Sequence, residues 1–144
     1  MRYGICKLSV VPMRKEASHT SELVSELLFN DIYKIIDENE EWVKIQCMYD
    51  LYEGWIRKLQ HNEITDDELK DYISKDKYIV NVPVLHYENM IISFGSKVFR
   101  NTEGTIPLSK NYDPDVLTDS AFRMLNVPYR WGGKSVMGID CSAF

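Results

Sequence analysis

The chain has 144 residues, of which 44% are hydrophobic and 12% aromatic, and this composition excludes an intrinsically disordered protein. The length allows one domain or two small ones. A formal net charge of -5 gives no basic field that would hold nucleic acid or an anionic membrane surface. Because no run of about 18 apolar residues occurs, no membrane-spanning helix is expected.

The three cysteines, Cys6, Cys47 and Cys141, are scattered along the chain. No two are spaced as a metal-binding pair, and an odd number makes a poor disulfide framework. The first residues contain Gly4, Lys7 and Ser9, which interrupt the apolar run that a secretion signal needs. We therefore expect a cytoplasmic protein with reduced thiols and no metal or organic cofactor.

Residues 1–60 alternate between short β-rich runs and polar turns. Strands are expected at residues 5–11, 23–29, 32–36, 42–47 and 50–56, and Asn30 with Asp31 is a turn signal. Strands at this spacing predict a small β-barrel or sandwich.

Residues 61–111 are expected to form a second, less regular β-barrel after a short helix. Thr65 and Glu68 have the spacing of a capping box. Further β-rich runs follow at residues 78–82, 84–87, 90–94 and 97–99.

A charged stretch at residues 110–115 predicts a boundary, and residues 112–144 are expected to be a third unit. It opens with a helix over residues 118–125. The apolar residues of that region fit one buried face, namely Val116, Leu117, Ala121, Phe122, Met124 and Leu125.

The final segment contains Cys141 between two residues that favour a helix N-terminus, Asp140 and Ser142. At such a position the helix dipole favours the thiolate, which is one route to a nucleophile. The alternative is a cysteine that packs as a small hydrophobic residue.

The whole segment resembles the nucleophile motif of the NlpC/P60 cysteine peptidases, in the order Tyr129-x-Trp131-Gly132-Gly133-x4-Gly138-x-Asp140-Cys141-Ser142. Family members usually have Gly where this chain has Ala143. The run Trp42-x-Lys44-x-Gln46 followed by Tyr52-Glu53-Gly54-Trp55-Ile56 is similar to the end of a bacterial SH3 (SH3b) domain. The combination resembles the γ-D-glutamyl-L-diamino acid endopeptidases, the dipeptidyl-peptidase VI group of that family.

The resemblance implies a mainly β protein in which two small SH3b-like β-barrels, at residues 1–60 and 61–111, precede the first, helix-containing part of an α+β NlpC/P60 (papain-like) domain at 112–144. It also implies hydrolysis of the γ-D-Glu–diamino acid bond in murein-derived peptides that carry a free N-terminal L-Ala. Cys141 would be the nucleophile, and Asp140, Ser142, Glu22 and Tyr52 would contact the substrate. Recycled murein peptides of this kind are met in the cytoplasm.

A nucleophilic cysteine needs a general base, which in this family follows the cysteine in sequence. The histidines of this chain all precede Cys141: we interpret His19 and His61 as surface residues and His86 as a packing residue. The sequence therefore predicts a truncated peptidase that is inactive as this chain.

Two alternatives remain open. The chain could be a non-catalytic SH3b module that binds a peptide or cell-wall fragment, or a naturally inactive paralogue. The sequence indicates neither the preferred diamino acid nor the oligomeric state.

Overall fold

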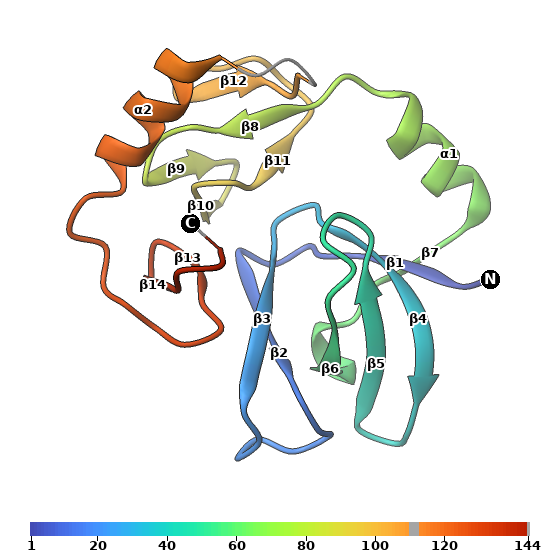
Figure 1. The fold of residues 1–144 in the computed structure, drawn as a ribbon. Coiled ribbons are helices and arrows are strands. Elements are labelled where there is room, and N and C mark those ends of the chain that lie inside the picture. Colours follow the sequence, from blue (N-terminus) through green and yellow to red (C-terminus); the bar gives the residue numbers. More distant parts are fainter. Residues whose placement is uncertain (110–112, 144) are drawn as a thin grey trace.

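The computed structural model describes residues 1–109 and 113–143. Seven strands form the first sheet, in the order β3-β2-β6-β5-β4-β1-β7. Their bounds are β1 (Tyr3–Ile5), β2 (Val10–Arg14), β3 (Leu23–Leu28), β4 (Ile32–Glu38), β5 (Trp42–Cys47), β6 (Glu53–Arg57) and β7 (Glu63–Ile64), with a 3-10 turn at Lys58–Gln60. The sheet curls into the barrel in the lower half of Figure 1.

One expected strand, at residues 5–11, was wrong, because the chain forms two strands there. β1 pairs with β4 and β7, whereas β2 pairs with β3 and β6. The change of partner requires the break at residues 6–9. The turn expected at Asn30 is confirmed, and Asn30 has a left-handed φ of 63° that asparagine tolerates.

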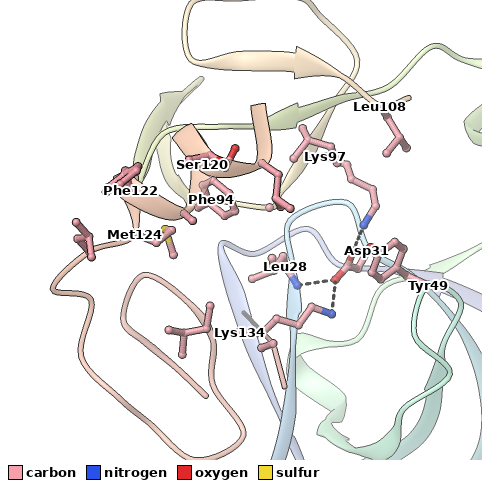
Figure 2. A pocket seen from close by; sticks show the side chains of 18 residues that line it. Leu28, Asp31, Tyr49, Phe94, Lys97, Leu108, Ser120, Phe122, Met124 and Lys134 are labelled. Atoms are coloured by element: carbon pink, nitrogen blue, oxygen red, sulfur yellow. Dashed lines mark hydrogen bonds and ion pairs between the residues drawn. The ribbon is translucent and has the colours of Figure 1, made fainter. Parts of the chain in front are cut away.

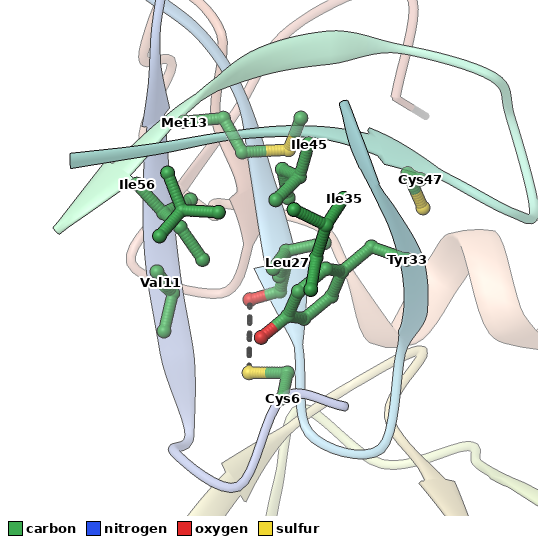
Figure 3. Packing of buried hydrophobic residues seen from close by; sticks show 10 residues of the cluster. Cys6, Val11, Met13, Leu27, Tyr33, Ile35, Ile45, Cys47 and Ile56 are labelled. Carbon is green, nitrogen blue, oxygen red and sulfur yellow. Dashed lines mark hydrogen bonds between the residues drawn. The ribbon is translucent and has the colours of Figure 1, made fainter. Parts of the chain in front are cut away.

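The core of this barrel is a cluster of aliphatic side chains around the buried ring of Tyr33 (Figure 3). Inward-facing positions of β2 and β6, and of β5 from Val43 onward, alternate with outward ones, as a half-buried sheet requires. Cys6 and Cys47 belong to this cluster, and burial raises their pKa values to about 12 and about 11. Both thiols are therefore protonated packing groups at neutral pH.

A short helix, α1 (Asp66–Ser74), links this barrel to the second group of strands. Its expected capping box is confirmed: the Glu68 N–H donates to Thr65 Oγ1 at 3.2 Å, and the Thr65 N–H donates to Glu68 Oε2 at 2.8 Å. The second group consists of β8 (Tyr78–Val80), β9 (Val84–Tyr87), β10 (Met90–Ser93), β11 (Lys97–Val98) and β12 (Thr105–Pro107). They pair as β11-β8-β12 and β10-β9.

The two groups of strands share side chains. Phe29, which directly follows β3, packs in the second core with Val80, Ile92 and Val98. The predicted boundary at residues 60/61 stays a prediction, although β7, beyond it, pairs with β1 of the first barrel. The boundary at 111/112 lies outside the described residues.

The last elements are α2 (Pro114–Arg123) and a hairpin of β13 (Lys134–Ser135) and β14 (Gly138–Ile139). The helix begins four residues before the expected Thr118, because Asp113 caps it and Pro114 takes the first turn. Within the described residues, neither helix is long and apolar enough to cross a membrane.

Candidate active site

The segment from residue 129 to 141 folds back on itself against strand β3. The hairpin β13–β14 closes it, and the Asp140 N–H donates to the Gly133 carbonyl oxygen at 3.1 Å. Figure 1 shows this hairpin beside β3. Gly132 has a φ of 70°, and a Cβ there would lie 2.4 Å from the Leu23 carbonyl oxygen. Glycine is therefore required for both the backbone conformation and the close approach to β3.

Asp140 organises the turn that carries Cys141. Its Oδ1 accepts hydrogen bonds from the Ser142 N–H, the Ser142 hydroxyl and the Ala143 N–H at 2.8–3.0 Å. Its Oδ2 accepts from the Gly132 N–H at 3.0 Å. Burial acts to raise the pKa of Asp140, but these hydrogen bonds outweigh it and hold the pKa below its ordinary value.

Cys141 itself is exposed on this turn. Residues 141–143 form a turn, and the helix expected to begin here stays a prediction. The carboxylate of Asp140 accepting from the next N–H groups is nevertheless the arrangement of a helix N-cap.

No histidine is hydrogen-bonded to Cys141 within residues 1–109 and 113–143. His19 is exposed and contacts the Trp42 ring edge-on, at 5.0 Å between centroids. The interpretation of His61 as a surface residue was wrong: 11% of its side chain is exposed, and its Nδ1 lies 3.0 Å from the Tyr33 hydroxyl. His86 was expected to be a packing residue, but it is exposed because it faces outward from β9.

Two of the predicted substrate contacts, Glu22 and Asp140, lie next to the same pair of residues. The Trp131 indole N–H donates to Glu22 Oε1 at 2.9 Å, and the adjoining Gly132 N–H donates to Asp140. The hydrogen bonds from Trp131 and Lys15 hold the pKa of Glu22 below its ordinary value. Two carboxylates, one from each end of the chain, are thus connected through consecutive residues.

The other two predicted substrate contacts, Tyr52 and Ser142, do not contact Trp131 or Gly132 through any hydrogen bond among the described residues. The Ser142 hydroxyl donates to Asp140, as described above. Tyr52 is 46% exposed just before β6, and its N–H donates to Asp50 Oδ1 at 3.1 Å. Asp50 Oδ2 accepts from Lys134 Nζ at 2.9 Å, so Asp50 connects the Tyr52 backbone to the segment that carries Cys141.

Three charged residues that hold this segment in place were not predicted from the sequence: Glu26, Asp31 and Lys134. Glu26 and Asp31 are each 1% exposed. Burial alone would lower the pKa of Lys134, but the charges of Asp31 and Asp50 and a hydrogen bond to Asp50 hold it above its ordinary value. The available signal was Glu26 itself, a charge inside the apolar run 23–29.

A cavity of about 690 Å³ lies between α2 and the first barrel (Figure 2). Ala143 is among its lining residues. One wall is charged and contains Asp31, Lys97 and Lys134; the opposite wall is the apolar side of α2. The expectation that this helix face is buried was wrong: of its residues only Met124 is buried, whereas Phe122 and Leu125 are each 63% exposed. This apolar face of α2 lines the cavity instead, and no element among the described residues covers it there.

Residues 13–60 match the family model of the bacterial dipeptidyl-peptidase SH3 domain. The first barrel is such an SH3 domain. Its strand β3 borders the segment that carries Cys141, so the domain contributes directly to the candidate site.

Two curated relatives extend the likeness. The chain is 26% identical to dipeptidyl-peptidase 6 of Lysinibacillus sphaericus over 163 aligned residues, which cover 85% of this chain and 59% of that protein. It is 23% identical to the gamma-D-glutamyl-L-lysine dipeptidyl-peptidase of Bacillus subtilis (strain 168) over 173 aligned residues, which cover 99% and 54%. The chain thus spans somewhat more than half the length of these relatives.

A solved NlpC/P60 family protein from Bacillus cereus ATCC 10987 has the same fold, with a TM-score of 0.75 over 98% of this chain and 69% of that one, at 15% identity. The expected mainly β fold, with an SH3b barrel first and an NlpC/P60 protein as a structural neighbour, is therefore confirmed. The roles assigned to the site residues stay predictions.

Proposed function

We propose that this chain supplies the substrate-binding SH3 domain and the nucleophile of a cysteine peptidase. The substrate is a murein peptide with a free N-terminal L-Ala, and the bond cleaved joins γ-D-Glu to the diamino acid. The observation that carries this proposal is the exposed Cys141 on a turn whose Asp140 is connected through Trp131 to Glu22 of the SH3 domain.

In the proposed reaction the Cys141 thiolate attacks the carbonyl carbon of the γ-amide and forms a thioester. The diamino acid leaves as an amine after taking up a proton, and water then hydrolyses the thioester. A general base and acid must come from a residue other than His19, His61 and His86, because all three are engaged or placed elsewhere. We accordingly propose that this chain binds the peptide without hydrolysing it.

Specificity for a free amine follows from charge. An α-ammonium group is a cation with three donors, and Glu22 and Asp140 are carboxylates whose pKa values are held low, so both are ionised at neutral pH. In this proposal the SH3 domain closes one end of the substrate-binding cleft at Cys141, and it thereby limits the substrate to short peptides. This limit, together with three free thiols, fits the cytoplasmic location that we include in the proposal.

The first test measures binding of L-Ala-γ-D-Glu-L-Lys to the purified chain by isothermal titration calorimetry. We expect Glu22→Gln and Asp140→Asn each to weaken binding about tenfold or more, because each removes a charge-assisted hydrogen bond. Glu53→Gln is the matched control, since Glu53 is an exposed glutamate of the same barrel. Equal binding of the N-acetylated peptide would contradict the assignment of the amine site.

The second test concerns catalysis. The purified chain should release no lysine from this tripeptide, and clear hydrolysis would show that the proposed inactivity is wrong. In a longer protein that contains this sequence and hydrolyses the peptide, Cys141→Ser should abolish turnover. The alternative is a non-catalytic binding module, which is favoured by the absence of a histidine at Cys141 among the described residues. Such a module would bind the peptide equally well after Cys141→Ser, and a longer protein that contains it would not hydrolyse the peptide.

A further inference from the structure

One buried carboxylate of the SH3 domain holds the nucleophile segment at two points. Glu26 lies on β3 with 1% of its surface exposed. Its Oε1 is 3.0 Å from the Arg130 guanidinium, and its Oε2 accepts the Lys134 backbone N–H at 2.9 Å. The five residues from Arg130 to Lys134 are therefore fixed at both ends by a single side chain.

These two points are connected to Cys141 by a short series of hydrogen bonds. Between them lie Gly132, whose N–H donates to the Asp140 carboxylate, and Gly133, whose carbonyl accepts the Asp140 N–H. Asp140 in turn accepts from the N–H groups of the two residues that follow Cys141. Any movement of the segment 130–134 away from β3 would therefore move the turn that carries the thiol.

Burial makes this arrangement sensitive to the charge of Glu26. A buried carboxylate is tolerated only with donors for its oxygens, and here both donors that contact it come from the nucleophile segment. If the segment departs, the carboxylate is left in the barrel without these partners. The docked position of the segment is thus strongly favoured.

We propose that Glu26 is a positioning residue for Cys141: the SH3 domain fixes the location of the nucleophile turn through this one carboxylate. The role in catalysis rests on the proposed function, but the positioning itself is measured without turnover. The SH3 domain then has a second function besides contacting substrate. It keeps Cys141 in position, because the turn that carries Cys141 keeps its place only while the segment 130–134 is docked on β3.

The experiment compares Glu26→Gln with the wild-type chain by amide hydrogen exchange and by the backbone resonances of Cys141 and Ser142. Glutamine keeps the size of the side chain but has one acceptor oxygen, so one of the two donors loses its partner. We expect the N–H groups of Lys134, Gly132 and Asp140 to exchange about tenfold to a hundredfold faster. The Trp131 indole N–H resonance should shift in the same variant.

The matched control is Glu53→Gln, which removes an exposed glutamate of the same barrel that pairs with Lys44 at 3.2 Å. It should leave the exchange of the segment and the Cys141 resonance as in the wild type. The amides of β4 and β5 should keep their protection in both variants. Wild-type exchange and an unmoved Cys141 resonance in Glu26→Gln would overturn the proposal.

If Glu26→Gln unfolds the barrel, Arg130 provides the second variant, because 42% of its side chain is exposed and it is not part of the buried core. Arg130→Met should move the Cys141 resonance, and Arg130→Lys, which keeps the cation, should restore it in part. An Arg130→Met chain with wild-type resonances would overturn the proposal. A longer protein that never turns over but keeps the docked segment would contradict only the peptidase function.

Discussion

Asp140 shares its two oxygens among four donors from residues on both sides of it. This makes it both the cap of the Cys141 turn and the link to Gly132. The two functions that the sequence suggested for it, helix capping and substrate binding, are compatible, since Oδ2 accepts only one of the four hydrogen bonds.

The pH dependence of the turn follows from this residue. Folding lowers the pKa of Asp140 below the value of about 3.9 for an unpaired aspartate. Its ionised form therefore stabilises the turn at neutral pH, and this contribution is lost as the pH falls below about 4 and through the folded-state pKa. An NMR titration of the Asp140 carboxyl carbon, with the Ser142 and Ala143 amides as reporters, should give a midpoint below the ordinary value.

Asp140→Asn is the control for that titration, because its amides should show no transition in the same pH range. A midpoint at or above the value of an unpaired aspartate would mean that the four hydrogen bonds do not form in solution.

At the scale of elements, the β13–β14 hairpin depends on how closely Gly132 approaches β3. Gly132→Ala combines an unfavourable positive φ, which costs about 1–3 kcal/mol, with a Cβ only 2.4 Å from the Leu23 carbonyl oxygen. We expect it to detach the segment from β3, which urea unfolding and the Trp131 indole N–H resonance can both follow.

Gly95→Ala provides the comparison. Gly95 also has a positive φ, of 82°, but a Cβ there would be 3.1 Å from the flexible end of Leu28. It should cost about 1–3 kcal/mol from the backbone alone and leave the Trp131 resonance in place. Equal effects of the two variants on Trp131 would show that the contact with Leu23 is unimportant.

Elements that follow from local pattern were predictable here, and elements that depend on a partner were not. The capping box of α1 was confirmed because Thr65 and Glu68 interact only with each other's backbone and side chains. The split between β1 and β2 was missed, because residues 5–11 contain no glycine or proline break and only the choice of sheet partners divides them.

For the whole molecule, the turn after β3 joins all three parts of the chain. Phe29 packs in the second core, the Asn30 side-chain amide donates to the Lys97 carbonyl at 2.9 Å, and Tyr72 of α1 donates to the Asn30 carbonyl at 2.8 Å. Asp31 pairs with Lys97 of the second group of strands, and its other oxygen lies 3.8 Å from Lys134 Nζ of the hairpin (Figure 2).

Asp31→Asn tests this junction. Removing one charge from a buried ion-pair network leaves the other charges uncompensated, which costs about 3–5 kcal/mol. We expect a loss of that size in urea unfolding, and separate transitions for the SH3 domain and the remaining residues.

Glu41→Gln is the matched control, because its ion pair with Arg57 has a glutamate side chain that is 66% exposed. It should cost less than about 1 kcal/mol. If Asp31→Asn cost no more than Glu41→Gln, the parts of the chain would not be joined through Asp31.

The sequence by itself determined the mainly β fold, the SH3 domain and the motif around Cys141, because strand periodicity, turn residues and motif spacing are local properties of the chain. The tertiary structure alone decided that Glu26 and Asp31 are buried beside the segment that carries Cys141. It also decided that Glu22 lies beside Trp131, 109 residues further along. Contacts of this kind depend on which surfaces meet when the barrel closes, and no pattern within one segment records which distant donor satisfies a buried carboxylate.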